Sequence, residues 1–143
     1  MGLINELSER HGISARPFLI SGADRLFFRD VAAAATDEIE AVRAGDVVAL
    51  VGDFEPKSIA LLLRLIDRGA IIVPLSADTR PDHEYFFEAA GANVVIDGSY
   101  SVRRRAAPYS HPMLSDLRKR GHPGLILFST GTTGRPKAIL HDF

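Results

Sequence analysis

The chain has 143 residues, which is enough for one domain with a hydrophobic core. Hydrophobic residues make up 46% of the sequence and charged residues 24%, so the composition excludes a wholly disordered chain. The net charge of −1 argues against a general nucleic-acid binder, and the lack of cysteine excludes disulfides, thiolate metal sites and a cysteine nucleophile.

Short apolar runs alternate with helical patterns along the chain. In chain order, the pattern first predicts a strand at 24–28, a helix over about 29–43 and a strand at 47–51. A helix that begins within 53–56 and ends just before Gly69 follows, then a strand at 70–73, a helix at 81–90 and a strand at 93–96. Residues 97–123 are expected to be mostly a surface connection with one short helix at 112–120, and strands are predicted at 125–128 and 138–140. The positions expected to face inward are Val31, Ala35, Ile39 and Val42 in the first helix, Ile59, Leu62, Leu63 and Ile66 in the second, Phe86, Ala89 and Ala90 in the third, and Met113 and Leu117 in the last.

The central part of this pattern is β-α-β-α-β with short connections. Such crossovers imply parallel strands joined in a right-handed sense. The predicted fold class is therefore α/β with a mainly parallel sheet, a fold that by itself indicates no function.

Charge is distributed unevenly. Residues 100–143 hold eight Lys and Arg but only two acidic residues, Asp116 and Asp142. This basic third either faces an anionic ligand or pairs with acidic surface elsewhere, and charge alone favours pairing. The runs Arg103–Arg105 and Arg118–Arg120 lack the interleaved aromatic residues of a stacking surface, so we expect no nucleic-acid partner.

No apolar run reaches the roughly 18 residues of a membrane-spanning helix. The start of the chain is polar and acidic, unlike a secretion signal. Together with the absence of cysteine, these features lead us to expect a cytoplasmic protein without a membrane span.

The segment between the last two predicted strands carries the chemistry. It reads Ser129-Thr130-Gly131-Thr132-Thr133-Gly134-Arg135-Pro136-Lys137. Two glycines allow tight turns and close approach of the backbone to a ligand, hydroxyls add hydrogen-bond donors, and two side chains are cationic. Many donors, close approach and positive charge are what a polyphosphate requires.

Known phosphate motifs do not fit this loop. A Walker-type P-loop needs Gly-Lys-Ser/Thr opening onto a helix, whereas Gly134 is followed by Arg135-Pro136-Lys137 and a predicted strand. A Gly-x-Gly-x-x-Gly dinucleotide fingerprint after a strand is also missing. Because Ser, Thr and Gly are ordinary loop residues, a non-catalytic α/β module with a polar surface turn is the alternative. Side chains of 129–137 packed against other elements would favour that alternative.

The order of residues in the loop, however, closely resembles a known family. Phe128–Lys137, FSTGTTGRPK, resembles the signature loop of the AMP-forming acyl-CoA synthetases, whose relatives include peptide-synthetase adenylation domains and beetle luciferases. Further segments resemble family segments in the same order: 26–30, 45–50 (GDVVAL), 61–74 (ending RGAIIVP) and 90–96 (AGANVVI). The sequence departs from the family at Ala138, where glycine is usual, and over 97–121, where no segment matches.

The resemblance implies a fold and a site. Residues 1–143 would be the N-terminal portion of the large, AMP-binding domain of an adenylate-forming enzyme, with a parallel β-α-β-α-β core followed by a strand–loop–strand phosphate-binding element. The rest of the large domain and the C-terminal lobe would lie outside this sequence. Ser129, Thr130, Gly131, Thr132, Thr133, Gly134, Arg135, Pro136 and Lys137 would bind the phosphates of ATP, with no catalytic residue among them.

The resemblance also implies an activity for the intact parent. The parent would activate a small carboxylic acid with ATP and Mg²⁺ to an acyl-adenylate and pass the acyl group to a thiol, most simply that of coenzyme A. A peptide-synthetase-type enzyme would load a carrier protein instead. We expect residues 1–143 alone to be inactive, and to associate with the remainder of the polypeptide or with themselves through an unpaired sheet edge.

The histidines give weaker signals. None of the five has a partner at His-x-x-x-His spacing, so no metal site is predicted. His141, where the family also carries a histidine, is equally consistent with approaching a bound ligand and with capping the next element.

Overall fold

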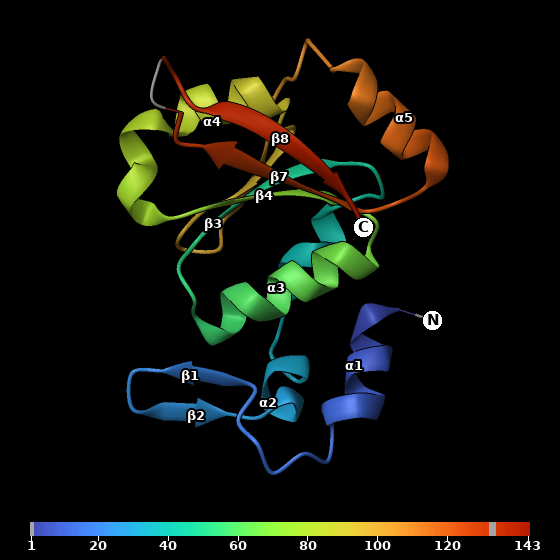
Figure 1. Ribbon diagram of the computed structural model, residues 1–143, viewed down its shortest axis with the longest axis vertical. Coiled ribbons are helices and arrows are strands. Elements are labelled where there is room, and N and C mark those ends of the chain that lie inside the picture. The colour runs from blue at the N-terminus through green and yellow to red at the C-terminus, as the bar shows by residue number, and fades with distance from the viewer. Residues whose placement is uncertain (1, 132–133) are drawn as a thin grey trace.

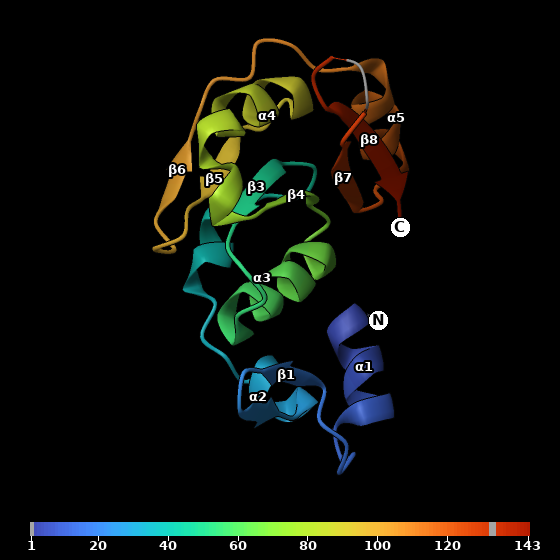
Figure 2. The ribbon, with the colours of Figure 1, turned by 60° about the vertical axis from the view of Figure 1, so that its left-hand side comes forward.

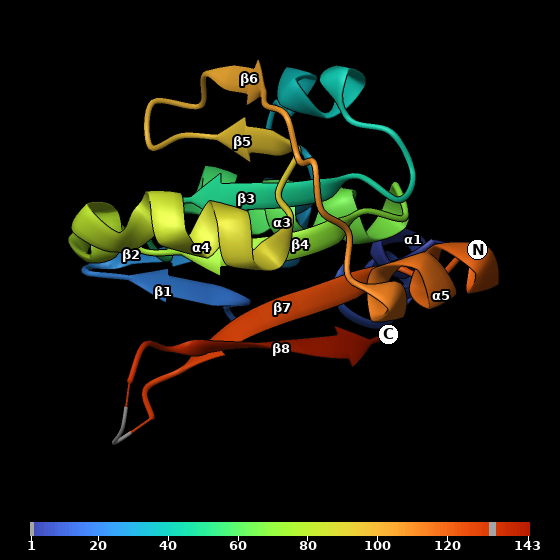
Figure 3. The same cartoon turned by 90° about the horizontal axis from the view of Figure 1, so that it is seen from above.

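The computed structural model describes residues 2–131 and 134–143, and it has a six-stranded sheet at its centre. The sheet order is β6-β5-β3-β4-β7-β8, as Figure 3 shows from above. The pairs β3–β4, β3–β5 and β4–β7 are parallel, and the outer pairs β5–β6 and β7–β8 are antiparallel. The predicted α/β class with a mainly parallel core is therefore confirmed.

The strands are β1 Leu19–Ser21, β2 Asp24–Leu26, β3 Val47–Val51, β4 Ile71–Leu75, β5 Val94–Ile96, β6 Val102–Arg104, β7 Gly124–Ser129 and β8 Lys137–Asp142. The α-helices are α1 Leu3–His11, α2 Phe28–Ala32, α3 Pro56–Asp67, α4 His83–Ala90 and α5 Pro112–Arg120. Two 3-10 helices, η1 Asp37–Ala41 and η2 Ala77–Asp82, complete the set.

Helices cover both faces of the sheet (Figures 1 and 2). Helix α3 lies on one face, and α4 and α5 lie on the other. Right-handed crossovers explain why α3 and α4 lie on opposite faces, because the β3-to-β4 and β4-to-β5 connections run in opposite directions along the sheet. Helices α1 and α2 and the β1–β2 hairpin form a further layer beyond α3.

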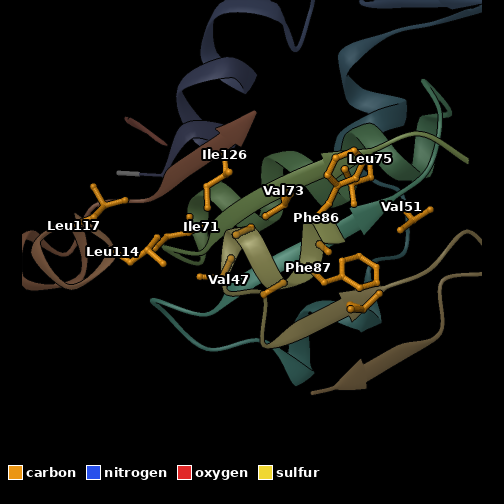
Figure 4. Close-up of a cluster of buried hydrophobic side chains, with 14 residues drawn as sticks. Val47, Val51, Ile71, Val73, Leu75, Phe86, Phe87, Leu114, Leu117 and Ile126 are labelled. Atoms are coloured by element: carbon orange, nitrogen blue, oxygen red, sulfur yellow. The ribbon is translucent and has the colours of Figure 1, made fainter. Parts of the chain in front are cut away.

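The core consists of two clusters, one on each face of the sheet. Strand β3 divides its side chains between them: Val47, Ala49 and Val51 join Phe86 and Phe87 of α4 (Figure 4), while Val48 and Leu50 join Leu61 and Leu65 of α3. Every residue of β3 is buried, as expected of a strand covered on both sides. Each such buried aliphatic side chain contributes about 1.5–3 kcal/mol to folding.

The helix predicted over 29–43 is wrong in its length. Helix α2 ends at Ala32, Ala35 is exposed, and η1 follows as a separate element. Arg64 of α3 and Arg68, which follows α3, contribute to the break, because they bind the carbonyls of Ala32 and Ile39, which a continuous helix would have used itself. Arg64 Nη2 donates to the Ala32 carbonyl at 2.8 Å, and the Arg68 guanidinium donates to the carbonyls of Val42 and Ile39.

The predicted inward faces of three helices need correction. In α3 the fully buried apolar residues are Ala60, Leu61 and Leu65, and the predicted positions are only half-buried. The reason is that α3 lies between the sheet and the α1–α2 layer, so its whole circumference is partly covered. In α4 and α5 the predicted Ala89 and Met113 are exposed, and their neighbours Phe87 and Leu114 are buried instead.

The connection over 97–123 contains a strand that the sequence did not predict. Strand β6 lies inside the arginine run and pairs with β5. It is an edge strand whose backbone completes the ladder, while its arginines are part-exposed and contact neighbouring elements: Arg103 lies over the Phe87 ring and Arg104 binds Asp46.

Helix α1 is attached through its N-terminus. The carboxylate of Asp67, at the end of α3, accepts hydrogen bonds from the backbone N–H groups of Leu3 and Ile4, the latter at 3.2 Å. These groups lack partners within α1, so a residue distant in sequence caps the helix. No helix in the described part of the chain is long and apolar enough to cross a membrane.

Candidate functional site

The predicted strand–loop–strand element is confirmed. Strands β7 and β8 pair antiparallel from Gly124 with Asp142 to Ser129 with Lys137, and residues 130–136 connect them. Because β7 is parallel to β4, this loop leaves the sheet at the edge where β3, β4 and β5 also end (Figure 3). The carboxyl edge of a parallel sheet is the usual place for ligands in open α/β folds.

The β7–β8 hairpin diverges from the rest of the sheet. Only Ile71 with Gly124 and Ile72 with Leu125 are paired between β4 and β7. The Ile71 N–H and the Leu75 carbonyl form hydrogen bonds on the β3 side of β4, whereas the Ala70 carbonyl accepts a hydrogen bond from Gly124 of β7. The alternation along β4 therefore turns Pro74 towards β7, where proline has no N–H to donate. The ladder ends before Pro74, and the hairpin carries its loop beyond the sheet.

The described part of the loop is open to solvent. Thr130, Gly131, Gly134, Arg135 and Lys137 are exposed, and Ser129 and Pro136 are half-buried. Gly134 has φ +84, a left-handed conformation that glycine adopts without strain. Thr132 and Thr133, which are also predicted to bind phosphate, lie outside the described residues. With most side chains unpacked, the loop does not meet the condition that would have favoured a purely structural turn.

Lys137 is the first residue of β8, so the loop leads into a strand. A Walker-type P-loop would place its lysine at the start of a helix, and this alternative is therefore excluded. No salt bridge within residues 2–131 and 134–143 includes Arg135 or Lys137. The two cations thus give this end of the hairpin a positive charge available to an anion.

Tyr85 of α4 contacts the exit of the loop. Its hydroxyl donates a hydrogen bond to the Pro136 carbonyl at 2.7 Å, and the guanidinium carbon of Arg135 lies 4.7 Å from the centroid of its ring. Sequence reasoning missed Tyr85, because the helical pattern indicated only the apolar neighbours that face the core. Its position next to Phe86 was the only available signal.

His141 lies on β8 opposite Leu125, and its side chain is exposed. It lies four positions after Lys137, which is about 14 Å along an extended strand. Its proximity to a ligand stays a prediction. In the described part of the chain, no three His, Asp or Glu side chains gather as metal ligands.

A crevice of about 750 Å³ opens at the same edge of the sheet, between the ends of β3 and β5 and helix α4. Tyr100 lies in the connection beside it with φ 64, which is unusual for a residue with a side chain. Burial raises the pKa of the Tyr100 phenol, whose hydroxyl lies 2.9 Å from Glu55 Oε2 and 3.1 Å from Ser58 Oγ. The Ser99 hydroxyl lowers the pKa of Asp97 by donating to its carboxylate.

No family model matches the sequence, and no curated protein matches it. Solved structures do match the fold. The N-terminal domain of FACL13 from Mycobacterium tuberculosis, solved with an inhibitor bound, aligns with a TM-score of 0.64 at 20% identity, over 97% of this chain and 43% of that one. The N-terminal subdomain of NpsA from Klebsiella oxytoca, in complex with 3-hydroxybenzoyl-AMSN, aligns with a TM-score of 0.64 at 22% identity, over 96% of this chain and 39% of that one.

A third structure is that of the o-succinylbenzoate CoA synthetase MenE from Bacillus subtilis, in complex with the acyl-adenylate intermediate OSB-AMP. It aligns with a TM-score of 0.66 at 15% identity, over 98% of this chain and 42% of that one. The chain therefore has the fold of the N-terminal domains of adenylate-forming enzymes. It spans about two-fifths of the length of the structures that it matches.

Proposed function

We propose that this chain is the N-terminal portion of an AMP-forming carboxylate ligase, and that its loop at 129–137 binds the phosphates of ATP. The single observation that carries the proposal is the loop itself: a hydroxyl- and glycine-rich segment with two exposed cations, at the ligand-binding edge of a sheet whose fold matches adenylate-forming domains. The complexes of NpsA and MenE with adenylate-type ligands support the same class of chemistry.

The reaction sets what the loop has to do. An oxygen of the carboxylate attacks the α-phosphorus of ATP and forms a new P–O bond, while the bond to the bridging oxygen breaks and pyrophosphate leaves with that electron pair. Negative charge therefore accumulates on the leaving pyrophosphate. Lys137 and Arg135 would stabilise this charge, and the backbone N–H groups of Gly131 and Gly134 with the Thr130 hydroxyl would fix the position of the phosphates.

The acyl group would then pass to a thiol. We propose coenzyme A as the acceptor, with the thiol arm of a carrier protein as the alternative, since the matched structures include both a CoA synthetase and NpsA, which was also studied fused to a carrier protein. Mg²⁺ would enter bound to ATP and neutralise part of the phosphate charge.

The test is pyrophosphate exchange into ATP with the full-length polypeptide that carries these residues. A panel of acetate, medium- and long-chain fatty acids, benzoates and amino acids should reveal at least one acid that supports exchange. Lys137→Ala should lower the exchange rate about 10- to 100-fold, because the lysine acts on charge that develops as the pyrophosphate leaves. Its melting temperature should be nearly unchanged, since the side chain is exposed.

Lys119→Ala is the matched control. Lys119 is an exposed lysine on α5 that pairs with Asp116 on the same helix, at 3.8 Å. Its replacement should leave exchange unchanged. An absence of exchange with every acid, or equal rates in the Lys137→Ala and Lys119→Ala variants, would overturn the proposed function. Thioester formation with free coenzyme A then distinguishes the two acceptors.

A further inference from the structure

We infer that Tyr85 is a positioning residue for the phosphate loop, and that it holds the guanidinium of Arg135 at the rim of the loop for use by a bound polyphosphate. This inference rests on the proposed function, which assigns phosphate binding to the loop. It adds a residue from a different element, α4, that the loop sequence does not indicate.

Tyr85 fixes the exit of the loop beyond the reach of the β-ladder. The ladder of β7 and β8 ends where Ser129 pairs with Lys137, so the next residue towards the loop, Pro136, has no partner from the opposite strand. The Tyr85 hydroxyl supplies one, by donating to the Pro136 carbonyl at 2.7 Å. That peptide group joins Pro136 to Lys137, so the hydrogen bond orients the backbone from which the lysine side chain extends.

Tyr85 also lies near the entrance of the loop. Its ring centroid is 6.4 Å from that of Phe128, the residue before Ser129, and Phe128 packs on Phe86 with ring centroids 4.4 Å apart. Phe86 is buried in the core beneath α4. Tyr85 therefore contacts both ends of the loop from a rigid helix, and it sets the separation between the points where the loop begins and ends.

The Arg135 guanidinium lies over the face of the Tyr85 ring, 4.7 Å from its centroid. A cation–π contact of this kind leaves N–H donors of the guanidinium for hydrogen bonds, and arginine uses such donors to bind a phosphate in a bidentate manner. None of the hydrogen bonds found between described residues uses the Arg135 side chain. The ring thus orders a long cationic side chain before a ligand arrives, which reduces the entropy lost on binding.

A purely structural tether would predict something different. In that case, loss of Tyr85 would lower the melting temperature and leave affinity for phosphate unchanged. A positioning role instead predicts that the contribution of Arg135 to affinity depends on Tyr85. This dependence is measurable as a coupling between the two residues, which simple destabilisation would not produce.

The experiment measures binding of MgATP to the full-length polypeptide by calorimetry, with pyrophosphate-exchange kinetics in parallel. Tyr85→Phe removes the hydrogen bond and keeps the ring, and it should weaken MgATP binding about three- to tenfold, the effect of one lost hydrogen bond. Tyr85→Leu removes both contacts and should weaken binding further. Tyr109→Phe is the matched control, because Tyr109 is 65% exposed and, among the described residues, the tyrosine hydrogen bond to the loop comes from Tyr85 and not from Tyr109. This variant should bind as the wild type does.

A double-mutant cycle tests the second half of the inference. Arg135→Gln should weaken MgATP binding severalfold in the wild type and in Tyr85→Phe, which keeps the ring. It should have little effect in Tyr85→Leu, where the arginine is no longer held at the rim. Hydrogen exchange provides a readout independent of the nucleotide: Tyr85→Phe should speed exchange of the backbone amides of Arg135 and Lys137 without changing that of β3.

The outcomes separate the two proposals. Suppose that the wild type binds MgATP, that Lys137→Ala binds it more weakly, and that Tyr85→Phe and Tyr85→Leu bind it as the wild type does. This result would overturn the inference and leave the proposed function intact. An equal effect of Arg135→Gln in the wild type and in Tyr85→Leu would overturn the role given to the ring. Absence of MgATP binding to the wild type would overturn the proposed function, and the inference with it.

Discussion

Arg104, on the edge strand β6, reaches past the end of β5 to Asp46 at the start of β3, where its Nη2 lies 3.0 Å from Asp46 Oδ2. Asn93 completes the link: its amide donates to Asp46 Oδ1 at 2.8 Å, and its carbonyl oxygen accepts from the Val47 N–H at 2.7 Å. Asp46 is only 8% exposed, so this network joins three strands through a buried carboxylate.

The first prediction concerns this carboxylate. Burial acts to raise the pKa of Asp46, but hydrogen bonds from the Arg43 backbone, Arg104 and Asn93 outweigh burial and hold the pKa below its usual value. A pKa lowered by folding means that the unfolded state binds the proton more tightly. The stabilisation is therefore complete above the unfolded pKa, about 4, and is lost as the pH falls through the lower pKa of the folded state.

Asp46→Asn should lower the free energy of unfolding by about 1–3 kcal/mol at neutral pH, because it leaves Arg104 without its charged partner. Urea unfolding from pH 7 down to pH 3 measures the effect. The difference from wild type should begin to shrink as the pH falls below about 4, where Asp46 of the unfolded wild type takes up its proton, and it should disappear only below the lower pKa of the folded state. A constant difference across this range would contradict the assigned role of the charge.

The second prediction concerns the end of α4. Gly91 has φ 68 and ends the helix in the left-handed conformation, and an added Cβ would lie 3.3 Å from the Tyr109 carbonyl oxygen. Gly91→Ala should destabilise the protein by about 1–2 kcal/mol, the cost of that conformation for a residue with a side chain. Gly98→Ala is the control, since a Cβ there would meet nothing within 4 Å. Equal melting temperatures for the two variants would refute the prediction.

The third prediction concerns the attachment of α1. Asp67→Asn weakens the carboxylate that caps the first turn of this helix, so the amides of Leu3 and Ile4 should exchange with solvent faster, and the stability should fall by about 1 kcal/mol. Exchange in β3 should stay slow, because the sheet does not depend on the cap. Asp116→Asn, in an exposed pair on α5, should change neither quantity. Uniformly faster exchange throughout the protein would indicate global destabilisation instead of a lost cap.

The fourth prediction concerns the outer edge of the sheet. Strand β8 has no neighbour on its far side within the described residues, and Leu127 and Ile139, which are opposite each other in the hairpin, are 41% and 46% exposed. We expect the 143-residue chain to self-associate through this edge as its concentration rises. Ile139→Lys should shift sedimentation towards the monomer. Ile13→Lys, at a position 98% exposed and outside the sheet, should not. A monomer at all concentrations would refute the expectation.

The elements that the sequence predicted best are those whose pattern depends only on burial. Strand β3 appears as a continuous apolar run because both of its faces are covered, and Gly91 marks the end of α4 because the cap requires its conformation. Strand β6 was missed for the opposite reason. It is held by backbone pairing with β5 and by the contact of Arg104 with Asp46, and the charged residues Arg103 and Arg104 leave no apolar period in the sequence.

The site shows the same division. The loop could be proposed from the sequence because the residues expected to bind phosphate, Ser129–Lys137, are consecutive. The contact of Tyr85 with Pro136 joins residues far apart in the sequence, and only the packing of α4 against the β7–β8 hairpin brings them together. The break between α2 and η1 was unpredictable in the same way, because it depends on Arg64 of α3 and on Arg68 just after it, which bind carbonyls of an earlier segment.

The arrangement of parallel pairs at the centre and antiparallel pairs at the rims has a consequence for how the chain reaches its native state. Both rim hairpins close over short stretches of chain, whereas the central pairs join distant residues, such as Ile71 with Gly124. Contacts between distant residues require a large loss of chain entropy before they form, which makes their pairing slow. We therefore expect the β7–β8 hairpin to form early during folding and to remain incompletely buried until β7 pairs with β4.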